Sequence, residues 1–201
     1  MPLINVIIPS QSYEIIRDRI AVVLADELSG QAQLTYDTEL EKTSITVEKI
    51  NPEDKVIMST INVSFSTGNY DGKDYGSAVR ANPYQYNIDV YTSSKTIGNV
   101  AGDFLASKKL QRILGLCRYI LENPIYKTLG FAPGFIERCY CGEINIANAG
   151  KNDADNSMMG RLTFNVVAIE NCELITPQLI AGYETTVNVN GSSEGYFWEG
   201  N

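Results

Sequence analysis

The hydrophobic pattern changes its period along the chain, and this change restricts the possible folds more than any other feature of the sequence. In residues 12–28 and 102–122 apolar residues recur every three or four positions, which is typical of amphipathic helices. In residues 84–91 aromatic and aliphatic residues alternate with polar ones, which is typical of a strand with one apolar face and one wet face. A chain that switches period in this way is predicted to contain both helices and strands.

Both predicted helices have start or stop signals. Ser12 is a candidate N-cap with Glu14 in the first turn, and Gly30 is expected to end the first helix. The second helix is expected to end at Asn123, because the residue before Pro124 is pushed out of the α region. The apolar stripes predicted to be buried are Ile16, Ile20, Val23, Leu24 and Leu28 in the first helix, and Leu110, Ile113, Leu114, Cys117, Ile120 and Leu121 in the second.

Four further segments are predicted to be strands. These are residues 45–50, 56–66, 135–146 and 160–170. Adjacent strands are joined by connections too short for helical crossovers, so we expect an α+β fold with a mainly antiparallel sheet and the two principal helices packed on one face. One domain is expected over residues 1–180, followed by a C-terminal arm or tail over residues 181–201.

Composition narrows the class of protein. With 44% hydrophobic and 20% charged residues, a chain of 201 residues is expected to fold as a single domain. A formal charge of −8 and a pI near 4.6 disfavour non-specific attraction to nucleic acid. The chain has no run of about 18 apolar residues and no basic segment before a short apolar start, so neither a membrane span nor export is expected. Four cysteines in 201 residues fit a reducing compartment.

The absence of one residue type and of two motifs bears most directly on which catalytic mechanisms are possible. There is no histidine, which removes Ser-His-Asp and Cys-His nucleophiles, imidazole bases and every histidine-containing metal site. Neither a P-loop nor a Gly-x-Gly-x-x-Gly motif occurs. We therefore expect a protein that is not an enzyme, with no catalytic residues, no cofactor and no bound metal.

Two segments contain residue types that bind metals, but each has a simpler explanation. Cys139 and Cys141 with Cys172 could supply three thiolates to zinc, but a strand that points small apolar side chains at the core explains the same residues. The segment that begins at Asp153 resembles the start of a calcium loop, but it lacks the glycine and the glutamate that such a loop needs at its sixth and twelfth positions. The pairs Asp71 with Asp74 and Asp153 with Asp155 are expected to be solvated loop residues.

Exposed segments are the candidates for contacts between subunits or with partners. The loops at 68–77 and 149–157 are rich in Gly, Asp and Asn, and the segment from Thr185 onward has no Lys or Arg but keeps three large aromatic residues. Aromatic residues on a tether suit docking on a neighbouring subunit, although a strand and tail that pack on their own domain would explain the same residues. The candidate contact residues are Tyr70, Asp71, Asp74, Tyr75, Asp153, Asp155, Tyr196, Phe197 and Trp198.

The order of the predicted elements resembles that of the tail-terminator (tail-completion) proteins of long-tailed bacteriophages. The resemblance covers residues 10–175 and includes the strand that ends Ile88-Asp89-Val90-Tyr91, the helix that ends Leu121-Glu122-Asn123-Pro124, and the late strand over residues 160–166. It depends on element order and not on a diagnostic motif. The chain looks longer than many members of that family past residue 176.

This resemblance implies a structural virion protein, located in the tail or neck and assembled in the host cytoplasm. It implies a homo-oligomeric ring, a hexamer, that caps the tail tube, contacts the tail-tube protein and presents a surface to the head-completion or neck proteins. DNA would pass through the ring without specific nucleic-acid binding, and no membrane would be involved. The alternatives are another tail or connector subunit, such as a tail-tube or head-tail joining protein, and an enzyme that uses carboxylates or a metal.

Overall fold

The computed structural model describes residues 7–49, 59–70, 79–148, 156–171, 184–187 and 196–199. Its contacts divide the chain into two compact units, Met1–Glu170 and Asn171–Asn201. The expected boundary between residues 180 and 181 lies outside the described residues.

The larger unit contains helices and strands in a mixed order. The helices are α1 (Ser12–Thr35), α2 (Thr38–Glu41), α3 (Gly102–Glu122) and the 3₁₀ helix η2 (Pro124–Tyr126). The strands are β1 (Ser44–Val47), β2 (Thr60–Gly68), β3 (Val79–Ser94), β4 (Ile136–Asn148) and β5 (Asn156–Asn171). The predicted α+β class with a mainly antiparallel sheet is confirmed.

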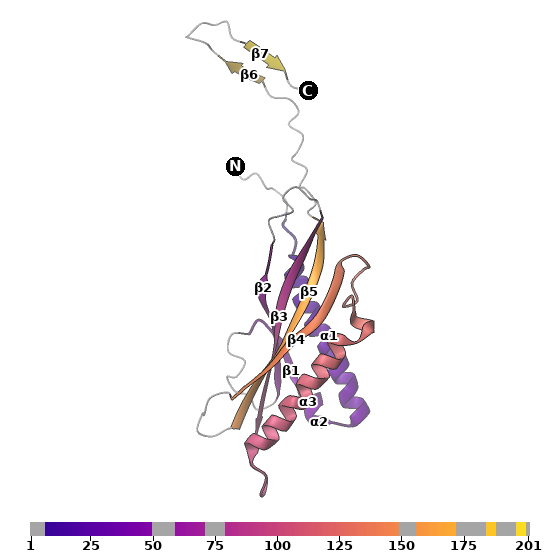
Figure 1. The fold of residues 1–201 in the computed structure, drawn as a ribbon, viewed down its shortest axis with the longest axis vertical. Coiled ribbons are helices and arrows are strands. Elements are labelled where there is room, and N and C mark those ends of the chain that lie inside the picture. Colours follow the sequence, from indigo (N-terminus) through magenta and orange to yellow (C-terminus); the bar gives the residue numbers. More distant parts are fainter. Residues whose placement is uncertain are drawn as a thin grey trace. The chain divides into compact units, whose positions relative to one another are not determined.

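The five strands form one sheet in the order β1-β2-β3-β5-β4 (Figure 1). The short edge strand β1 runs parallel to β2, whereas the pairs β2–β3 and β4–β5 are antiparallel. Side-chain contacts show that β3 and β5 also run in opposite directions, because Tyr84 contacts Glu170 while Asp89 contacts Arg161. The edge strands β1 and β4 differ in length, with 4 and 13 residues.

Both long helices cover the same face of the sheet. The hydroxyl of Tyr86 donates a hydrogen bond to the carbonyl of Tyr13 in α1, and the hydroxyl of Thr92 donates one to the carbonyl of Ala106 in α3. Tyr86 and Thr92 are six positions apart on β3, and successive side chains of a strand alternate between faces. They therefore point to one face, and the expected packing of two helices on one side of the sheet is confirmed (Figure 1).

Helix α1 starts and ends at different residues from those expected. Its N-cap is Gln11 and not Ser12, and the Glu14 side chain completes a capping box by accepting a hydrogen bond from the Gln11 backbone at 2.7 Å. Gly30 lies inside the helix, which continues to Thr35 and ends at Tyr36, whose φ of 54° is left-handed. A glycine inside a helix costs only about 1 kcal/mol relative to alanine. The helical turn that follows Gly30 buries Ala32 in the core.

Helix α3 agrees with its predicted bounds. It ends where the backbone of Asn123 turns extended before Pro124, and the Asn123 side chain then accepts a hydrogen bond from Ile125 N at 3.1 Å to cap η2. All eleven residues of the two predicted apolar stripes are buried: Ile16, Ile20, Val23, Leu24, Leu28, Leu110, Ile113, Leu114, Cys117, Ile120 and Leu121. These stripes pack on one continuous core with the inward residues of β2, β3 and β5, which are Ile61, Val63, Tyr84, Tyr86, Ile88, Val90, Leu162, Phe164, Val166 and Ala168.

The prediction of a wet second face on β3 is wrong at two positions. Asp89 and Tyr91 are only 4% and 7% exposed, although they alternate with the core-facing residues. β3 is a central strand with β2 and β5 on its two sides, and Arg161 of β5 covers Asp89. Alternation alone does not reveal such pairs between strands that are far apart in the sequence.

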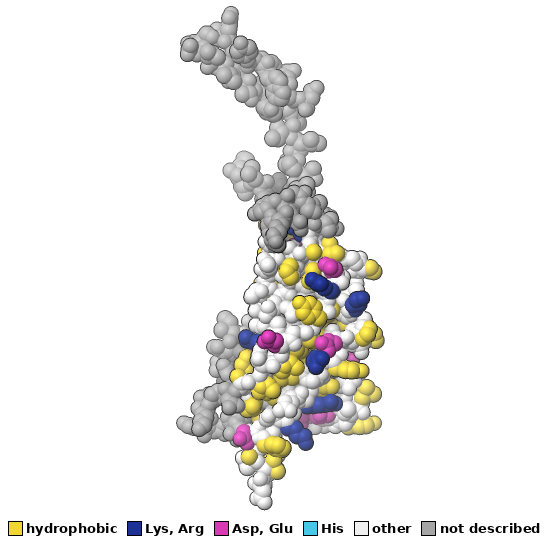
Figure 2. Space-filling model, viewed as in Figure 1, with side chains coloured by type: hydrophobic (Ala, Val, Ile, Leu, Met, Phe, Trp, Pro, Cys, Tyr) yellow, Lys and Arg dark blue, Asp and Glu magenta, His cyan; other side chains and the backbone are white. Residues whose placement is uncertain are grey.

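The surface of the larger unit mixes charged and apolar side chains. On the face seen in Figure 2, Lys, Arg, Asp and Glu are interspersed with hydrophobic residues. Large side chains exposed by more than 60% include Phe104, Tyr119 and Ile125. Among the described residues, no helix has both the length and the apolar character needed to cross a membrane.

The smaller unit contains one β-hairpin. Strands β6 (Glu184–Val187) and β7 (Tyr196–Glu199) pair antiparallel as a two-stranded sheet. Their register pairs Glu184 with Glu199, Thr185 with Trp198, and Thr186 with Phe197. Val187 pairs with Tyr196, so all three aromatic residues singled out in the sequence belong to register pairs of this hairpin.

Candidate functional site

An aromatic cluster lies at the end of the sheet where α1 begins, β2 ends and β3 begins. It consists of Tyr13, Phe65, Tyr70, Tyr84 and Tyr86, with ring centroids 4.8 Å apart for Tyr13 and Phe65 and 6.0 Å apart for Tyr70 and Tyr84. The Tyr84 and Tyr86 side chains are fully buried, whereas Tyr70 is 56% exposed. The cluster therefore holds one predicted contact residue, Tyr70, on a packed base while much of its ring faces solvent.

A carboxylate at the end of β5 is held beneath this cluster. Glu170 accepts hydrogen bonds from the Tyr84 hydroxyl at 2.5 Å and from the Asn82 amide at 2.7 Å. Burial raises the pKa of Tyr84, and the hydrogen bond to Glu170 raises it further. Burial likewise raises the pKa of Tyr86. Glu170 is the last residue of the larger unit, so these hydrogen bonds hold the end of β5 against β3.

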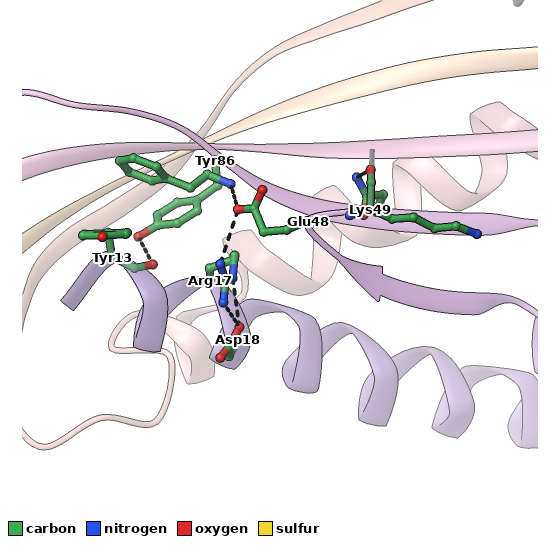
Figure 3. A network of polar contacts seen from close by, with 8 residues as sticks. Tyr13, Arg17, Asp18, Glu48, Lys49 and Tyr86 are labelled. Atoms are coloured by element: carbon green, nitrogen blue, oxygen red, sulfur yellow. Dashed lines mark hydrogen bonds and ion pairs between the residues drawn. The ribbon is translucent and has the colours of Figure 1, made fainter. Parts of the chain in front are cut away.

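A polar network ties β1 to this end of the molecule (Figure 3). The Arg17 guanidinium lies 2.8 Å from Asp18 and 3.5 Å from Glu48, and Glu48 accepts a hydrogen bond from the backbone N–H of Phe65 at 2.7 Å. Partial burial lowers the pKa of Arg17, but the hydrogen bonds and charges of both carboxylates outweigh it and raise the pKa overall. The Glu48 backbone has a φ of 50°, so the chain leaves β1 through a left-handed residue held by these contacts.

The helix-free face of the sheet carries a bidentate ion pair. Arg161 Nε and Nη2 donate to the two oxygens of Asp89 at 2.6 and 2.9 Å. The hydrogen bond to Asp89 raises the pKa of Arg161. On the same face Asn62 accepts hydrogen bonds from Thr46 and from the backbone of Lys49. These groups are paired within the protein, so they form a rigid polar surface and not a set of free reactive groups.

A groove between α2 and α3 is a further candidate site. Its volume is about 250 Å³, and its lining residues are Asp37, Glu39, Leu40, Leu105, Lys108, Lys109, Arg112 and Ile113. Lys109 Nζ lies 2.8 Å from Glu39 Oε2. Within the described ranges, no carboxylate forms an ion pair with Lys108 or Arg112. These two cations line the groove together with the apolar side chains of Leu40, Leu105 and Ile113.

The described cysteines are one buried thiol, Cys117, and two half-buried thiols, Cys139 and Cys141. Cys117 is fully buried, and burial raises its pKa to about 12, with the nearby Cys141 as a further cause. Burial also raises the pKa of Cys141 to about 12 and that of Cys139 above its usual range. No group of three or more His, Cys, Asp or Glu residues that could hold a metal occurs among the residues in the described ranges, and Cys172 lies outside them.

The described strand ends define two opposite ends of the sheet. β2 ends at Gly68 and β3 begins at Val79, at the same end as Glu170. β4 ends at Asn148, whose partner on β5 is Met158, at the opposite end. The end of β2, the start of β3 and Glu170 therefore share one end of the sheet, and the pair Asn148–Met158 marks the other.

Five of the nine predicted contact residues lie outside the described residues. These are Asp71, Asp74, Tyr75, Asp153 and Asp155. Tyr196, Phe197 and Trp198 lie on β7 in the smaller unit. Of the nine predicted residues, Tyr70 alone therefore has a described position in the larger unit.

Sequence reasoning missed the groove, the Asp89–Arg161 pair and the anchoring role of Glu170. The groove forms where α2 meets α3, and α2 has only 4 residues, too few to give a periodic signal. The two ion-pair residues are 72 positions apart in the sequence. A charged residue at an alternating position of a central strand, with an opposite charge on another strand, is the signal that could have suggested this pair.

Comparison with known proteins does not assign this chain to a family. No protein family matches this chain, and no curated protein is significantly similar to it.

Proposed function

We propose that this protein is a structural virion subunit, a bacteriophage tail terminator that closes into a ring on the tail tube and joins the tube to the head-completion proteins. The observation that carries the proposal is the two-ended construction of the larger unit. One end has the aromatic cluster and Glu170 at the end of β5, and at the other end Asn148 of β4 pairs with Met158 of β5. A ring that sits between a tube and a neck needs two chemically different faces of this kind.

The two edge strands of the sheet support self-association. Its two edges are different strands, β1 and β4, so contacts between edges of neighbouring copies would be heterologous. Heterologous contacts generate closed rings when the rotation between neighbours closes. Tyr140, Ile144 and Ile146 of β4 are each more than 40% exposed, which gives that edge apolar area to cover.

The charge distribution suits a passage for DNA. The chain has a net charge of −8, and on the helix-free face Arg161 is neutralised by Asp89. Its pairing with Asp89 makes Arg161 less available to the phosphate backbone, whose protein contacts come mainly from Lys and Arg. DNA could then pass through the ring without sticking to it.

Native mass spectrometry combined with negative-stain electron microscopy tests the proposal. We expect a discrete six-subunit species that appears as closed rings, together with binding of these rings to the ends of purified tail tubes. Open tubes of the protein alone would instead indicate a tail-tube subunit. A monomer that persists at high concentration and does not bind tube ends would contradict the proposal.

A further inference from the structure

The groove between α2 and α3 has the size and charge of a docking site for one anchor side chain. Its volume of about 250 Å³ is below the roughly 300–1,000 Å³ of ordinary small-molecule pockets. Leu40, Leu105 and Ile113 form its apolar part. Its lining also holds the ion pair Lys109–Glu39, and Asp37, which accepts hydrogen bonds from the α2 backbone. Lys108 and Arg112 form no ion pair with a described carboxylate, so the lining keeps a net positive charge. A fitting occupant combines a large apolar side chain with negative charge.

The C-terminal hairpin of this protein has that chemistry. Residues 172–201 contain four glutamates and no lysine or arginine, and β7 is the segment Tyr196-Phe197-Trp198-Glu199. The register makes Glu184 and Glu199 direct partners, which brings two formal negative charges to one position of the hairpin. Like charges at directly opposite positions destabilise a β pair, so cations beside them would stabilise this hairpin.

The hairpin also needs a surface on which to pack. It has two strands of 4 residues each, and an isolated two-stranded hairpin is marginally stable at best in water. Burial of an aromatic side chain and neutralisation of the two glutamates would both stabilise it. The groove offers both.

The choice of a neighbouring copy as the donor of the hairpin follows from the proposed ring. The groove surface of one copy and the hairpin of the next are different surfaces, so their contact is heterologous. Heterologous contacts of this kind propagate around a ring.

We infer that the groove formed by Leu40, Leu105, Lys108, Arg112 and Ile113 binds the β6–β7 hairpin of a second copy of this chain. Lys108 and Arg112 neutralise Glu184 and Glu199, and an aromatic residue of β7 covers the apolar floor. The inference rests on the proposed ring, for which it supplies a contact between neighbouring subunits.

Reciprocal charge reversal in the full chain tests this contact. Lys108→Glu with Arg112→Glu alters the groove alone, and Glu184→Lys with Glu199→Lys alters the hairpin alone. In sedimentation velocity each double variant is expected to associate at least about tenfold more weakly than the unaltered protein. The control is Arg118→Glu, a charge reversal at an exposed position of α3 outside the groove, which should leave association unchanged.

A mixture of the two double variants distinguishes a contact between copies from one within a chain. The mixture contains an unaltered groove on one chain and an unaltered hairpin on the other, and the altered pair is again complementary in charge. We expect association to recover in the mixture and to weaken as the salt concentration rises.

The remaining outcomes contradict either the inferred contact or the proposed function. If the groove variant assembles as well as the unaltered protein, or if the mixture does not recover, the inferred contact is wrong although the ring can stand. If the unaltered protein itself stays monomeric, the proposed function fails and this contact fails with it. Circular dichroism of every variant excludes misfolding as the cause of a loss.

Discussion

Tyr84 donates its hydroxyl hydrogen to Glu170 Oε1 at 2.5 Å, which fastens the last residue of the larger unit to the strand at the centre of its sheet. The Tyr84 side chain is 1% exposed, so its hydroxyl has no access to bulk water as a substitute partner. The end of β5 is therefore held against β3.

Removal of this carboxylate should destabilise the fold. Glu170→Ala leaves the buried Tyr84 hydroxyl and the Asn82 amide without their acceptor, which is expected to cost about 1–3 kcal/mol. Urea denaturation should show a lower midpoint with an unchanged slope. Tyr119→Phe is the control, because its side chain is 73% exposed and removal of its hydroxyl should change stability by less than about 0.5 kcal/mol. Equal stability of Glu170→Ala and the unaltered protein would show that Glu170 is not an anchor.

The two partners of the Asp89–Arg161 pair should respond unequally to substitution. Arg161→Met leaves a carboxylate whose side chain is only 6% exposed without a counter-charge, and the expected cost is roughly 2–4 kcal/mol. Asp89→Asn leaves a guanidinium that is 42% exposed and can turn to water, so a loss of roughly 1–2 kcal/mol is expected. Guanidinium denaturation of both variants and of the double variant gives their coupling energy. A larger loss for Asp89→Asn would contradict this assignment of the buried charge.

Gly30 should tolerate alanine with a gain in stability. It lies inside α1, and a Cβ added there would meet nothing within 4 Å. Alanine favours a helix interior over glycine by about 0.8–1 kcal/mol, so Gly30→Ala should raise the thermal midpoint by a few degrees. Gly130→Ala is the contrasting substitution. Its φ is +78°, and its Cβ would lie 2.6 Å from Arg19 Nη2, so a lower midpoint is expected.

High pH should destabilise the protein partly through Cys117. Its folded-state pKa is raised from 9.0 to about 12, so the unfolded chain loses this proton at a lower pH than the folded chain does. The stabilisation that the neutral thiol provides is fully present below pH 9 and is lost as the pH rises towards 12. Urea denaturation between these limits should show a smaller loss of stability with pH for Cys117→Ala than for the unaltered protein. The same loss in both would mean that this thiol does not titrate as described.

The long elements could be read from the sequence because their signals are local. The stripe of α3 and the break before Pro124 give both the extent of that helix and its buried face. The prediction that Gly30 ends the first helix is wrong for a related reason. A glycine is a weak local stop signal, and burial of Ala32 in the core supports one more helical turn.

The candidate site could be predicted only in part. Exposure of Tyr70 was predicted from the composition of its loop, but the ring beneath it belongs to Tyr84 of another strand. The groove depends on α2, which is too short to give a periodic signal, and on its contact with α3. Neither relationship leaves a trace within a short window of sequence.

The sequence by itself determined the α+β class, the two apolar helix faces and the alternating strands, because each depends on residues only a few positions apart. Only the tertiary structure decided that β1 runs parallel to β2, that Arg161 neutralises Asp89, and that Glu170 is held beneath the aromatic cluster. The physical reason is distance along the chain. Pairing between distant strands and burial of charge depend on which segments meet, and the free energy of those contacts is shared by residues that no local pattern connects.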